Sequence, residues 1–317
     1  MNMREEGRAP MSPVVPMSIG SVGVLEDDHV NDRVKGWIPP YLGKGTMHAH
    51  LLHAIRPVMD SKRSRLNLRV LSSQEPPAHT DITWNGAPLR REVLMPVVGH
   101  PRIKWAAYYG ATLVSRRQPG HVEQQEHELV RNAERRGASH VNSEISPEIL
   151  TNPTIEEVDQ IVQMYAAQFK GYLCPLDGAA VYRMIASAHV MIAREPAGSK
   201  IICIAVGEVA SLPVSDDDPE VVLIEISDSA VHPEWGGRGV YSTTKLALIE
   251  HLREVHPTAL ITAEARANAM SCMRTNVGLG MVDCGFQPVH CVISSSVADI
   301  QQVGPYGDLR VFFLPHD

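Results

Sequence analysis

The residues with the clearest chemical potential lie in a glycine-rich segment at positions 231–242, between a strongly apolar run and a predicted helix. Glycine allows the backbone to approach a ligand closely, and the first N–H groups of a helix have no partner within the helix. Because the helix dipole adds positive potential there, such a segment is typical of a pyrophosphate site. The residues expected to bind this group are Gly236, Gly237, Arg238, Gly239, Val240, Tyr241 and Ser242.

The spacing of this segment excludes two common phosphate-binding motifs. The chain contains no G-x-x-x-x-G-K-[ST], and the glycines of the segment do not fit G-x-G-x-x-G. The segment resembles instead the acyl-CoA loop of the GNAT acyltransferase superfamily, V-x-P-x-x-x-G-x-G-[VIL], although Glu234 replaces the family's Gln or Arg. The matching residues are Val231, Pro233, Gly237, Gly239 and Val240.

The resemblance is closest to the β-lysine N-acetyltransferase branch of that superfamily. It depends on EISDSAVHPEWGGRGVYS at 225–242 and AEARANAMSCMRTN at 263–276, with further likeness at 165–176 and 306–315. It implies acetyl-CoA, or another acyl-CoA, as the co-substrate, and no metal. It also implies that the backbone at Ala230 and Val231 holds the thioester and that Asn276 lies beside the cofactor.

Glu225 is the candidate general base, because it is the one ionisable residue in the apolar run VVLIEI at 221–226. Burial raises the pKa of a carboxyl group toward neutrality, where a general base works best. The alternative is that Glu225 pairs with a buried Arg or Lys, or anchors a substrate ammonium. Strand alternation places Ser227 on the same face, and Asp228 matches an acidic position of the resembled branch. Both are expected to bind the substrate amine.

The tyrosine that serves as general acid in the resembled family is missing at its expected position in this sequence. Many GNAT enzymes have a tyrosine about four residues before a Gly-Phe or Gly-Tyr pair in the last helix, but here Met281 stands four residues before Gly285-Phe286. Tyr241 is a candidate substitute, with ordinary packing as the alternative reading, and water is another proton source. The strand predicted at 259–265 is followed by Arg266 and Asn268. These two residues are candidates for contacts with the substrate or CoA; the alternative is that they satisfy backbone carbonyl groups at the end of the strand.

The elements that must position these residues follow from the hydrophobic periodicity of the C-terminal half. The predicted order is ααβββαβαββ, which agrees with the GNAT fold: a mixed central sheet flanked by helices. The elements are helices from Thr154 and over 178–187, strands over 189–194, 199–208 and 221–231, a helix from Val240, a strand over 259–265, a helix or loop over 268–280, and two final strands.

Three parts are expected along the chain. Residues 1–28 are predicted to be a mobile tail or a loosely docked arm, 29–148 a smaller α/β domain, and 149–317 a GNAT acyl-CoA-binding catalytic domain. No internal repeat is clear from the residues, but the resembled branch implies a degenerate GNAT-like half within the smaller domain. The predicted elements of that domain are a helix over 46–59, a strand over 66–71 and a solvated helix over 121–137.

Composition and charge exclude several classes of function. The 317 residues include 29 Lys and Arg against 36 Asp and Glu, a net charge of −7, which argues against nucleic acid as a partner. No run approaches the ~20 apolar residues that span a bilayer, so no membrane partner is expected. The five cysteines form no C-x-x-C pair, which argues against a disulfide framework or a zinc site and indicates a cytoplasmic location.

These observations predict an N-acetyltransferase that transfers an acetyl or other acyl group from acyl-CoA to a small amine or amino acid. The rival hypothesis is a catalytically weak acyl-CoA-binding sensor or scaffold, which the absence of the usual tyrosine favours. A protein amine as acceptor, a longer acyl chain and a homo-oligomeric state stay open on the residues alone.

Overall fold

The computed structural model describes residues 14–19, 23–28, 31–116, 123–135, 139–169, 177–292 and 306–316. The first part of the chain forms β1 (Val14–Ile19), β2 (Gly23–Asp28), β3 (Arg33–Trp37), α1 (Met47–Ile55), β4 (Arg65–Ser72), β5 (His79–Trp84), β6 (Ala87–Pro96), β7 (Trp105–Thr112) and α2 (Glu123–Arg135). The rest forms β8 (Glu148–Ile149), α3 (Ile155–Gln168), α4 (Gly178–Ser187), β9 (Ala188–Arg194), β10 (Ile201–Leu212), β11 (Val221–Val231), α5 (Val240–Val255), β12 (Leu260–Arg266), α6 (Met270–Gly278), β13 (Val282–Val292) and β14 (Tyr306–Phe313).

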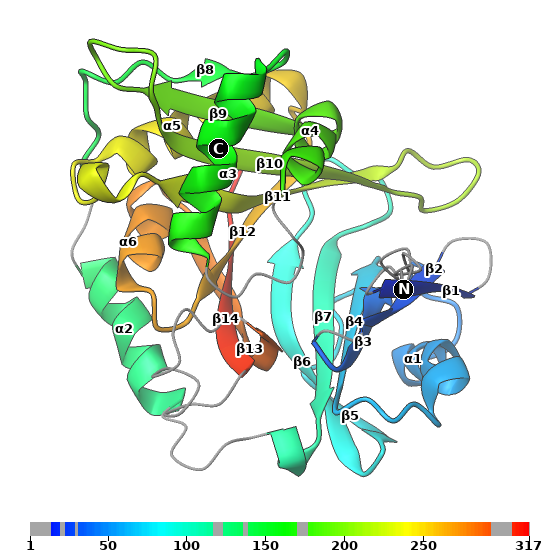
Figure 1. The fold of residues 1–317 in the computed structure, drawn as a ribbon. Coiled ribbons are helices and arrows are strands. Elements are labelled where there is room, and N and C mark those ends of the chain that lie inside the picture. Colours follow the sequence, from blue (N-terminus) through cyan, green and yellow to red (C-terminus); the bar gives the residue numbers. More distant parts are fainter. Residues whose placement is uncertain are drawn as a thin grey trace, which may run out of the picture.

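The described strands belong to one curved sheet that runs through both halves of the chain (Figure 1). Its order is β1-β2-β3-β4-β7-β6-β13-β14-β12-β11-β10-β9-β8, and β5 pairs with β6 beside this path. The fold is therefore mixed α/β, as predicted. From α3 onward the element order is ααβββαβαββ, which confirms the order predicted for the C-terminal half.

The same topology occurs twice in this sheet. Each half starts with three antiparallel strands, crosses through a helix into a parallel strand, and ends with two antiparallel strands in reversed spatial order. These elements are β1-β2-β3, α1, β4 and β7-β6 in the N-terminal half, and β9-β10-β11, α5, β12 and β14-β13 in the C-terminal half. The repeat that is not clear from the residues is thus evident in the strand order.

The two halves meet where the equivalent strands β6 and β13 pair, at Val93 and Gly285. A Cβ on Gly285 would lie 2.2 Å from the carbonyl oxygen of Glu92 and 2.7 Å from the Cα of Val93. The two backbones therefore approach so closely that glycine is required at this position. Gly285 and Phe286 were predicted to be the Gly-Phe pair of the last helix. This prediction is wrong, because both residues lie inside strand β13.

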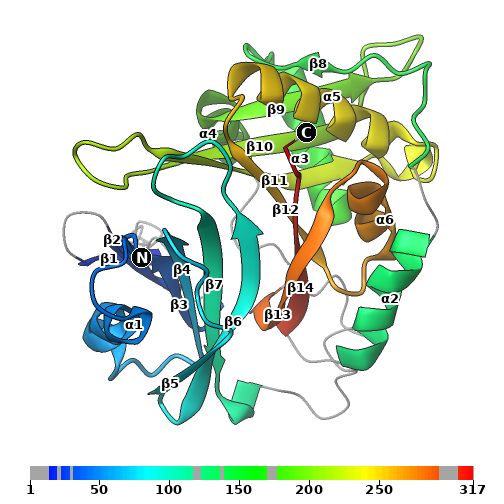
Figure 2. The same ribbon diagram turned by 180° about the vertical axis from the view of Figure 1, so that it is seen from behind.

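Helices cover the C-terminal strands on both faces. α3 and α4 lie in front of β9, β10 and β11 in Figure 1, and α5 lies on the opposite face in Figure 2. α3 begins at a capping box in which the Thr154 side chain accepts a hydrogen bond from the Glu157 N–H and the Glu157 carboxylate accepts one from the Thr154 N–H. This reciprocal cap fixes the helix start that the sequence predicted.

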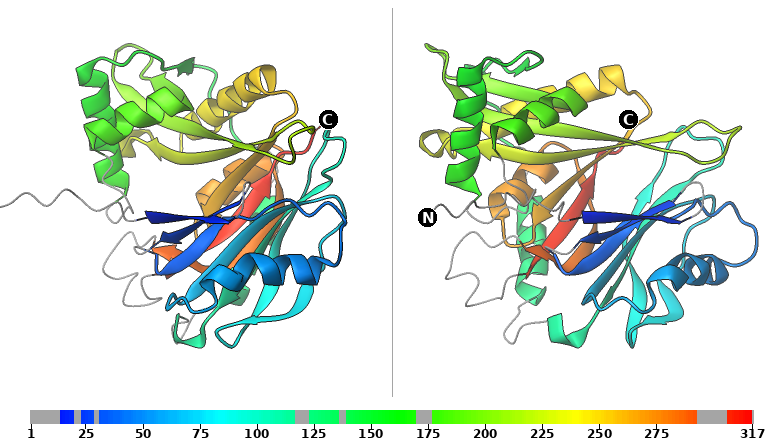
Figure 3. Two further views of the ribbon diagram at one scale, coloured as in Figure 1. Left: turned by 90° about the vertical axis from the view of Figure 1, so that its right-hand side faces the viewer. Right: turned by 45° about the vertical axis from the view of Figure 1, so that its right-hand side comes forward.

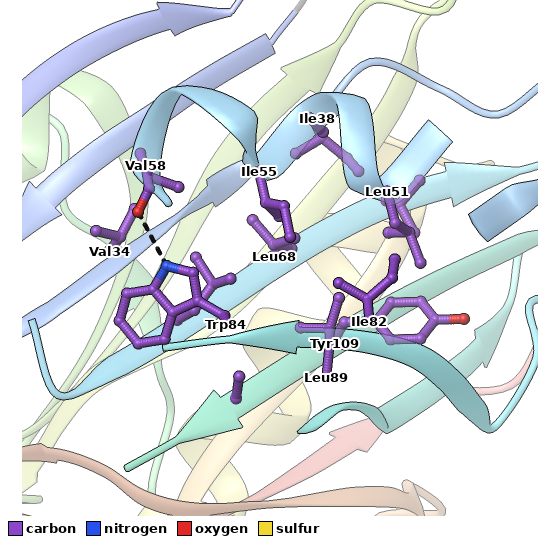
Figure 4. Packing of buried hydrophobic residues seen from close by; sticks show 14 of the residues in the cluster. Val34, Ile38, Leu51, Ile55, Val58, Leu68, Ile82, Trp84, Leu89 and Tyr109 are labelled. Atoms are coloured by element: carbon purple, nitrogen blue, oxygen red, sulfur yellow. Dashed lines mark hydrogen bonds between the residues drawn. The ribbon is translucent and has the colours of Figure 1, made fainter. Parts of the chain in front are cut away.

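α1 covers the N-terminal strands on the side away from the C-terminal half (Figure 3). Its buried residues Leu51 and Ile55 pack with Leu68 of β4 and Trp84 of β5 (Figure 4). The indole N–H of Trp84 donates a 2.9 Å hydrogen bond to the carbonyl oxygen of Val58, so this buried polar group is satisfied. The N-terminal half thus has a hydrophobic core of its own.

The other face of the N-terminal strands packs against the C-terminal half. An apolar cluster joins Leu71 and Tyr108 of the first half to Leu223, Leu260 and Val311 of the second. Beside this cluster the facing side chains become charged, and Arg69 of β4 forms a 3.4 Å ion pair with Glu264 of β12. The interface between the halves therefore has an apolar part and a polar part.

Some boundaries differ from the sequence-based expectation. Within the stretch predicted as a tail, residues 14–19 and 23–28 form β1 and β2, because they complete the antiparallel meander beside β3. Residues 1–13 lie outside the described part. α2, predicted within the smaller domain, packs beside α6 of the other half. The division into three parts stays a prediction. No helix in the described ranges is long and apolar enough to cross a membrane.

Candidate active site

The glycine-rich segment forms a tight turn at the N-terminus of α5. Gly237 and Gly239 have φ values of 74° and 76°, in the left-handed region that favours glycine. A Cβ on Gly239 would also lie 2.6 Å from Cδ2 of His140. The first helical hydrogen bond runs from the Thr243 N–H to the Gly239 carbonyl oxygen, at 3.0 Å. The N–H groups of residues 240–242 therefore have no partner within the helix and are free to bind an anion.

A pocket of about 390 Å³ opens at this turn. Its size lies within the range of small-molecule sites. The turn, the end of β11 and the first turn of α5 form one side, and α6 forms another. The predicted cofactor-binding residues that line it are Val231, Gly236, Gly237, Gly239, Val240, Tyr241 and Ser242.

β11 separates from β12 beside this pocket. The two strands pair in parallel from Leu223–Leu260 to Ile226–Ala263. Beyond Ile226, residues 227, 230 and 231 of β11 pair with β10. A bulge lies in this last stretch, because residues 228 and 229 together oppose Ala205. Ser229 and Val231, which follow the separation, line the pocket. The separation leaves one backbone edge of β11 open to a bound ligand.

The bulge reverses the side-chain alternation of β11. Ile226 packs in the cluster formed with α5, whereas Ala230 packs in the cluster formed with α3 and α4 on the opposite face. At the bulge Asp228 has a φ of 40°, an uncommon value for a residue other than glycine. Tyr165 of α3 donates a 2.7 Å hydrogen bond to the Asp228 carbonyl oxygen and so helps to hold this backbone conformation.

The N-terminal half has an equivalent turn before α1, at Pro39, Gly43, Lys44 and Gly45. Gly43 and Gly45 have φ values of 81° and 77°, and their spacing after β3 equals that of Gly237 and Gly239 after β11. Here, however, the backbone stays paired with β4. The Ile38 N–H donates to the Arg69 carbonyl oxygen, and the Tyr41 N–H donates to the Leu71 carbonyl oxygen. The strands do not separate, so this half lacks the open edge seen beside the pocket.

Sequence reasoning missed the segment that covers the glycine turn from outside. Ser139 and His140 line the pocket. The Asn142 N–H donates a 2.8 Å hydrogen bond to Thr243 Oγ1, and its side-chain amide donates a 3.1 Å bond to the Arg238 carbonyl oxygen. This segment follows α2 with no motif, so only the tertiary structure places it here. Other pocket residues not anticipated are Gln168, Ser271, Cys272, Arg274 and Thr275.

Glu225 lies on the face of β11 that is turned toward the N-terminal half. Its direct neighbours in register are Glu208 of β10 and Thr262 of β12, and Glu264 follows two residues after Thr262. Charged groups of the N-terminal half act on it from the opposite side, chiefly Arg69 and also Lys35. We call Glu26, Lys35, Arg69, Glu208, Glu225 and Glu264 the interface cluster.

The environment of Glu225 favours its protonated form. Burial raises the pKa of this carboxyl group to about 8, repulsion from Glu264 and Glu208 adds to the shift, and Arg69 and Lys35 oppose it. Arg69 is itself paired with Glu264, and Lys35 lies 3.5 Å from Glu26. The interface cluster contains four acidic groups against two cations, and an excess of acidic groups attracts a cationic ligand. The pKa of Asp228 is also raised by burial, to about 6.

Tyr241 lies in the wall of the pocket beside the end of β11. Burial raises the pKa of its phenol, and a hydrogen bond with Ser229 opposes this shift. A Gly-Met pair, Gly280-Met281, follows α6 after Leu279, and the residue four positions before Gly280 is Asn276. The position of the expected tyrosine is thus occupied by an asparagine, which is buried and bonded to Lys245.

Several predicted site residues do not line the pocket. Arg238 is exposed, and its guanidinium lies 5.1 Å from the centre of the Trp235 ring. Ala230 and Asn276 are buried behind the wall. Arg266 and Asn268 lie beyond the pocket at the end of β12, where the Arg266 carbonyl oxygen accepts a bond from the Ala269 N–H. Glu225 belongs to the interface cluster and Ser227 follows it on β11, and neither residue lines the pocket.

No family model matches the chain, and no curated protein matches it. Solved structures similar to about half of it include the ribosomal-protein-S18-alanine N-acetyltransferase from Escherichia coli, at 13% identity and a TM-score of 0.39, over 54% of this chain and 93% of that one. A ribosomal-protein-S5-alanine acetyltransferase from Vibrio fischeri is similar at 12% identity and 0.41, over 57% and 97%. A GNAT family acetyltransferase from Elizabethkingia anophelis with acetyl-CoA bound is similar at 10% and 0.37, over 55% and 100%. Values of this size identify no function.

Proposed function

We propose that this chain is a GNAT-type N-acyltransferase that transfers an acetyl or other acyl group from acyl-CoA to a small, cationic amine. The observation that carries the proposal is the junction of β11 and α5. There a turn with two left-handed glycines and unpaired helical N–H groups continues directly from a strand edge that has separated from its neighbour. Such a junction suits a ligand with a pyrophosphate at one end and an extended arm at the other.

In this proposal the pocket holds the acyl-CoA. The N–H groups at the start of α5 bind the pyrophosphate, with Ser242 as a further donor. The open edge of β11 holds the pantetheine arm, and a backbone N–H at Ala230 or Val231 polarises the thioester carbonyl group and stabilises the oxyanion. Tyr241, beside Ser229, is the candidate donor of a proton to the leaving thiolate.

The acceptor amine approaches from the interface between the two halves. Glu225 removes a proton from the incoming ammonium, and its raised pKa suits a base that operates near neutral pH. The excess of carboxylates in the interface cluster attracts the ammonium, and Asp228 and Ser227 are the candidates to position it. The N-terminal half would thus form the wall of the acceptor site through Lys35 and Arg69, rather than a second acyl-CoA site.

The test is thiol release from acetyl-CoA in the presence of a panel of small amines, amino acids and diamines. We expect turnover with at least one cationic small amine, and loss of turnover in Glu225→Gln with acetyl-CoA binding retained. Turnover with peptide amines alone would overturn the small-amine assignment. Failure of acetyl-CoA and longer acyl-CoAs to bind in calorimetric titration would overturn the acyltransferase assignment itself.

One observation favours a second candidate function, a catalytically weak acyl-CoA sensor or scaffold. The position of the expected acid carries Asn276 in place of tyrosine. Tight acetyl-CoA binding that is unchanged by Glu225→Gln, without turnover of any amine, would support this alternative.

A further inference from the structure

Lys245 is a buried lysine behind the pocket that the proposed mechanism does not use. It lies on α5 one turn after Tyr241, is fully buried, and places Nζ 5.9 Å from the centre of the Tyr241 ring. Nζ donates a hydrogen bond to Asn276 Oδ1. Asn276 lies on α6 one turn after Cys272, and both Tyr241 and Cys272 line the pocket. Lys245 and Asn276 therefore form a second layer directly behind these two wall residues.

No carboxylate among the described residues forms an ion pair with Lys245. The titratable groups around it are the Tyr241 phenol on its own helix and the Cys272 thiol on α6, with Cys203 of β10 acting in turn on Tyr241. Burial lowers the pKa of Lys245 to about 7, and Cys272 opposes this shift. A buried charge without a counter-charge is costly. An anion formed in the pocket would supply that counter-charge.

Building on the proposed function, we propose that Lys245 stabilises the CoA thiolate as it leaves. Glu225 takes the first proton from the ammonium before attack. When the C–N bond forms, the C–S bond breaks and its electron pair stays on sulfur; Tyr241 then gives its proton to this thiolate and takes the second proton from the nitrogen. In the proposed binding mode the sulfur lies at the inner end of the pocket, beside Tyr241 and Cys272. Lys245 does not touch it and acts through this wall, so it is a positioning residue whose charge is held in place by Asn276.

The experiment measures the thiol of bound CoA directly. The ultraviolet absorbance of the thiolate is followed against pH in complexes of the full chain with CoA, with desulfo-CoA as the blank. In the wild-type protein we expect the thiolate to form about one pH unit below its ordinary pKa of ~8.5. Lys245→Met should return the titration to its ordinary range and lower kcat about tenfold, with KM for the amine unchanged.

A second variant keeps the test decisive if Lys245→Met does not fold, and a third protein serves as a negative control. Asn276→Asp retains the lysine but gives it a carboxylate partner, so it should abolish the thiol shift as well. Lys44→Met removes the exposed lysine from the equivalent turn before α1 and should leave the titration unchanged.

The possible outcomes separate this inference from the function on which it rests. If amines are acetylated but the bound thiol titrates at its ordinary pKa in the wild-type protein, the role of Lys245 is wrong and the acyltransferase proposal stands. A shift that persists in both Lys245→Met and Asn276→Asp would also overturn that role. If CoA does not bind at all, both proposals fail together.

Discussion

Glu208 and Glu225 are register partners across β10 and β11, so two carboxylates lie directly opposite each other on one face of the sheet. Like charges at such positions repel each other. Burial raises the pKa of both groups, that of Glu225 to about 8, and Glu264 on the next strand adds to the repulsion. The carboxyl groups on this face, which is turned toward the N-terminal half, therefore favour binding of a proton or a cation.

Glu225→Gln should lower kcat by about 10²–10⁴-fold, the usual contribution of a general base. In the wild-type protein activity should rise with pH toward a plateau above about pH 8, because the base works in its ionised form. This rise should be absent in the variant. Initial rates measured from pH 6 to pH 10 check both expectations, with the exposed Glu220→Gln as the control. An unchanged pH profile in Glu225→Gln would assign the base to another residue.

The same carboxyl group should make stability depend on pH. Its pKa in the folded protein is about 8, above the ordinary 4.5, so between these values the folded state holds a proton that the unfolded state has lost. Its contribution is complete below about pH 4.5 and is lost as the pH rises through about 8. Thermal unfolding at several pH values should show a fall in Tm over this range that is smaller in Glu225→Gln. Equal falls in both proteins would contradict the buried environment of Glu225.

Two neighbours of Glu225 should shift its titration in opposite directions. Glu264→Gln removes a repelling charge and frees Arg69, so the acid limb of the pH–rate profile should move down by about one unit. Arg69→Met removes an attracting charge, so the limb should move up by a similar amount. The kcat/KM profile of each variant gives the shift, and movement in the same direction would refute the electrostatic account.

Gly239→Ala should damage acyl-CoA binding as well as stability. Its φ of 76° costs about 1–2 kcal/mol with a side chain present, and the new Cβ would collide with His140. The matched control is Gly45→Ala in the equivalent turn before α1, where φ is 77° and nothing lies within 4 Å of the Cβ position. Both variants should lose similar stability from strain, but only Gly239→Ala should raise the Kd for acetyl-CoA at least tenfold. Calorimetric titration and thermal unfolding measure the two effects separately.

Asn142→Ala should weaken acyl-CoA binding several-fold with little effect on Tm. The side-chain amide of Asn142 holds the Arg238 carbonyl oxygen, and so helps to fix the glycine turn. Its net contribution should be that of one partly exposed hydrogen bond, about 1 kcal/mol. Asn152→Ala, which lies between β8 and α3 and is hydrogen-bonded to its neighbour Thr151, is the control. Equal affinities in the two variants would show that the turn holds its shape without this contact.

The sequence by itself determined the local features of the C-terminal half. The Thr154 cap, the apolar run before Glu225 and the glycine spacing at 236–239 act over a few residues, so their structures could be predicted from hydrogen-bonding rules and periodicity. The element order from α3 to β14 followed from the same local signals. The pattern Pro-x-x-x-Gly-Lys-Gly at 39–45 was also present in the residues, and comparing its spacing with 233–239 would have indicated the repeat.

Only the tertiary structure decided what surrounds these elements. The pairing of β6 with β13 joins residues nearly 200 positions apart in the chain, and no local preference specifies it. This pairing turns Arg69 and Lys35 toward Glu225 and so decides the charges that act on the candidate base. Likewise the bulge at Asp228, the cover formed by His140 and the position of Lys245 behind the pocket each depend on segments distant in sequence. Packing and long-range electrostatics fixed these features, because they arise only when the two halves come together.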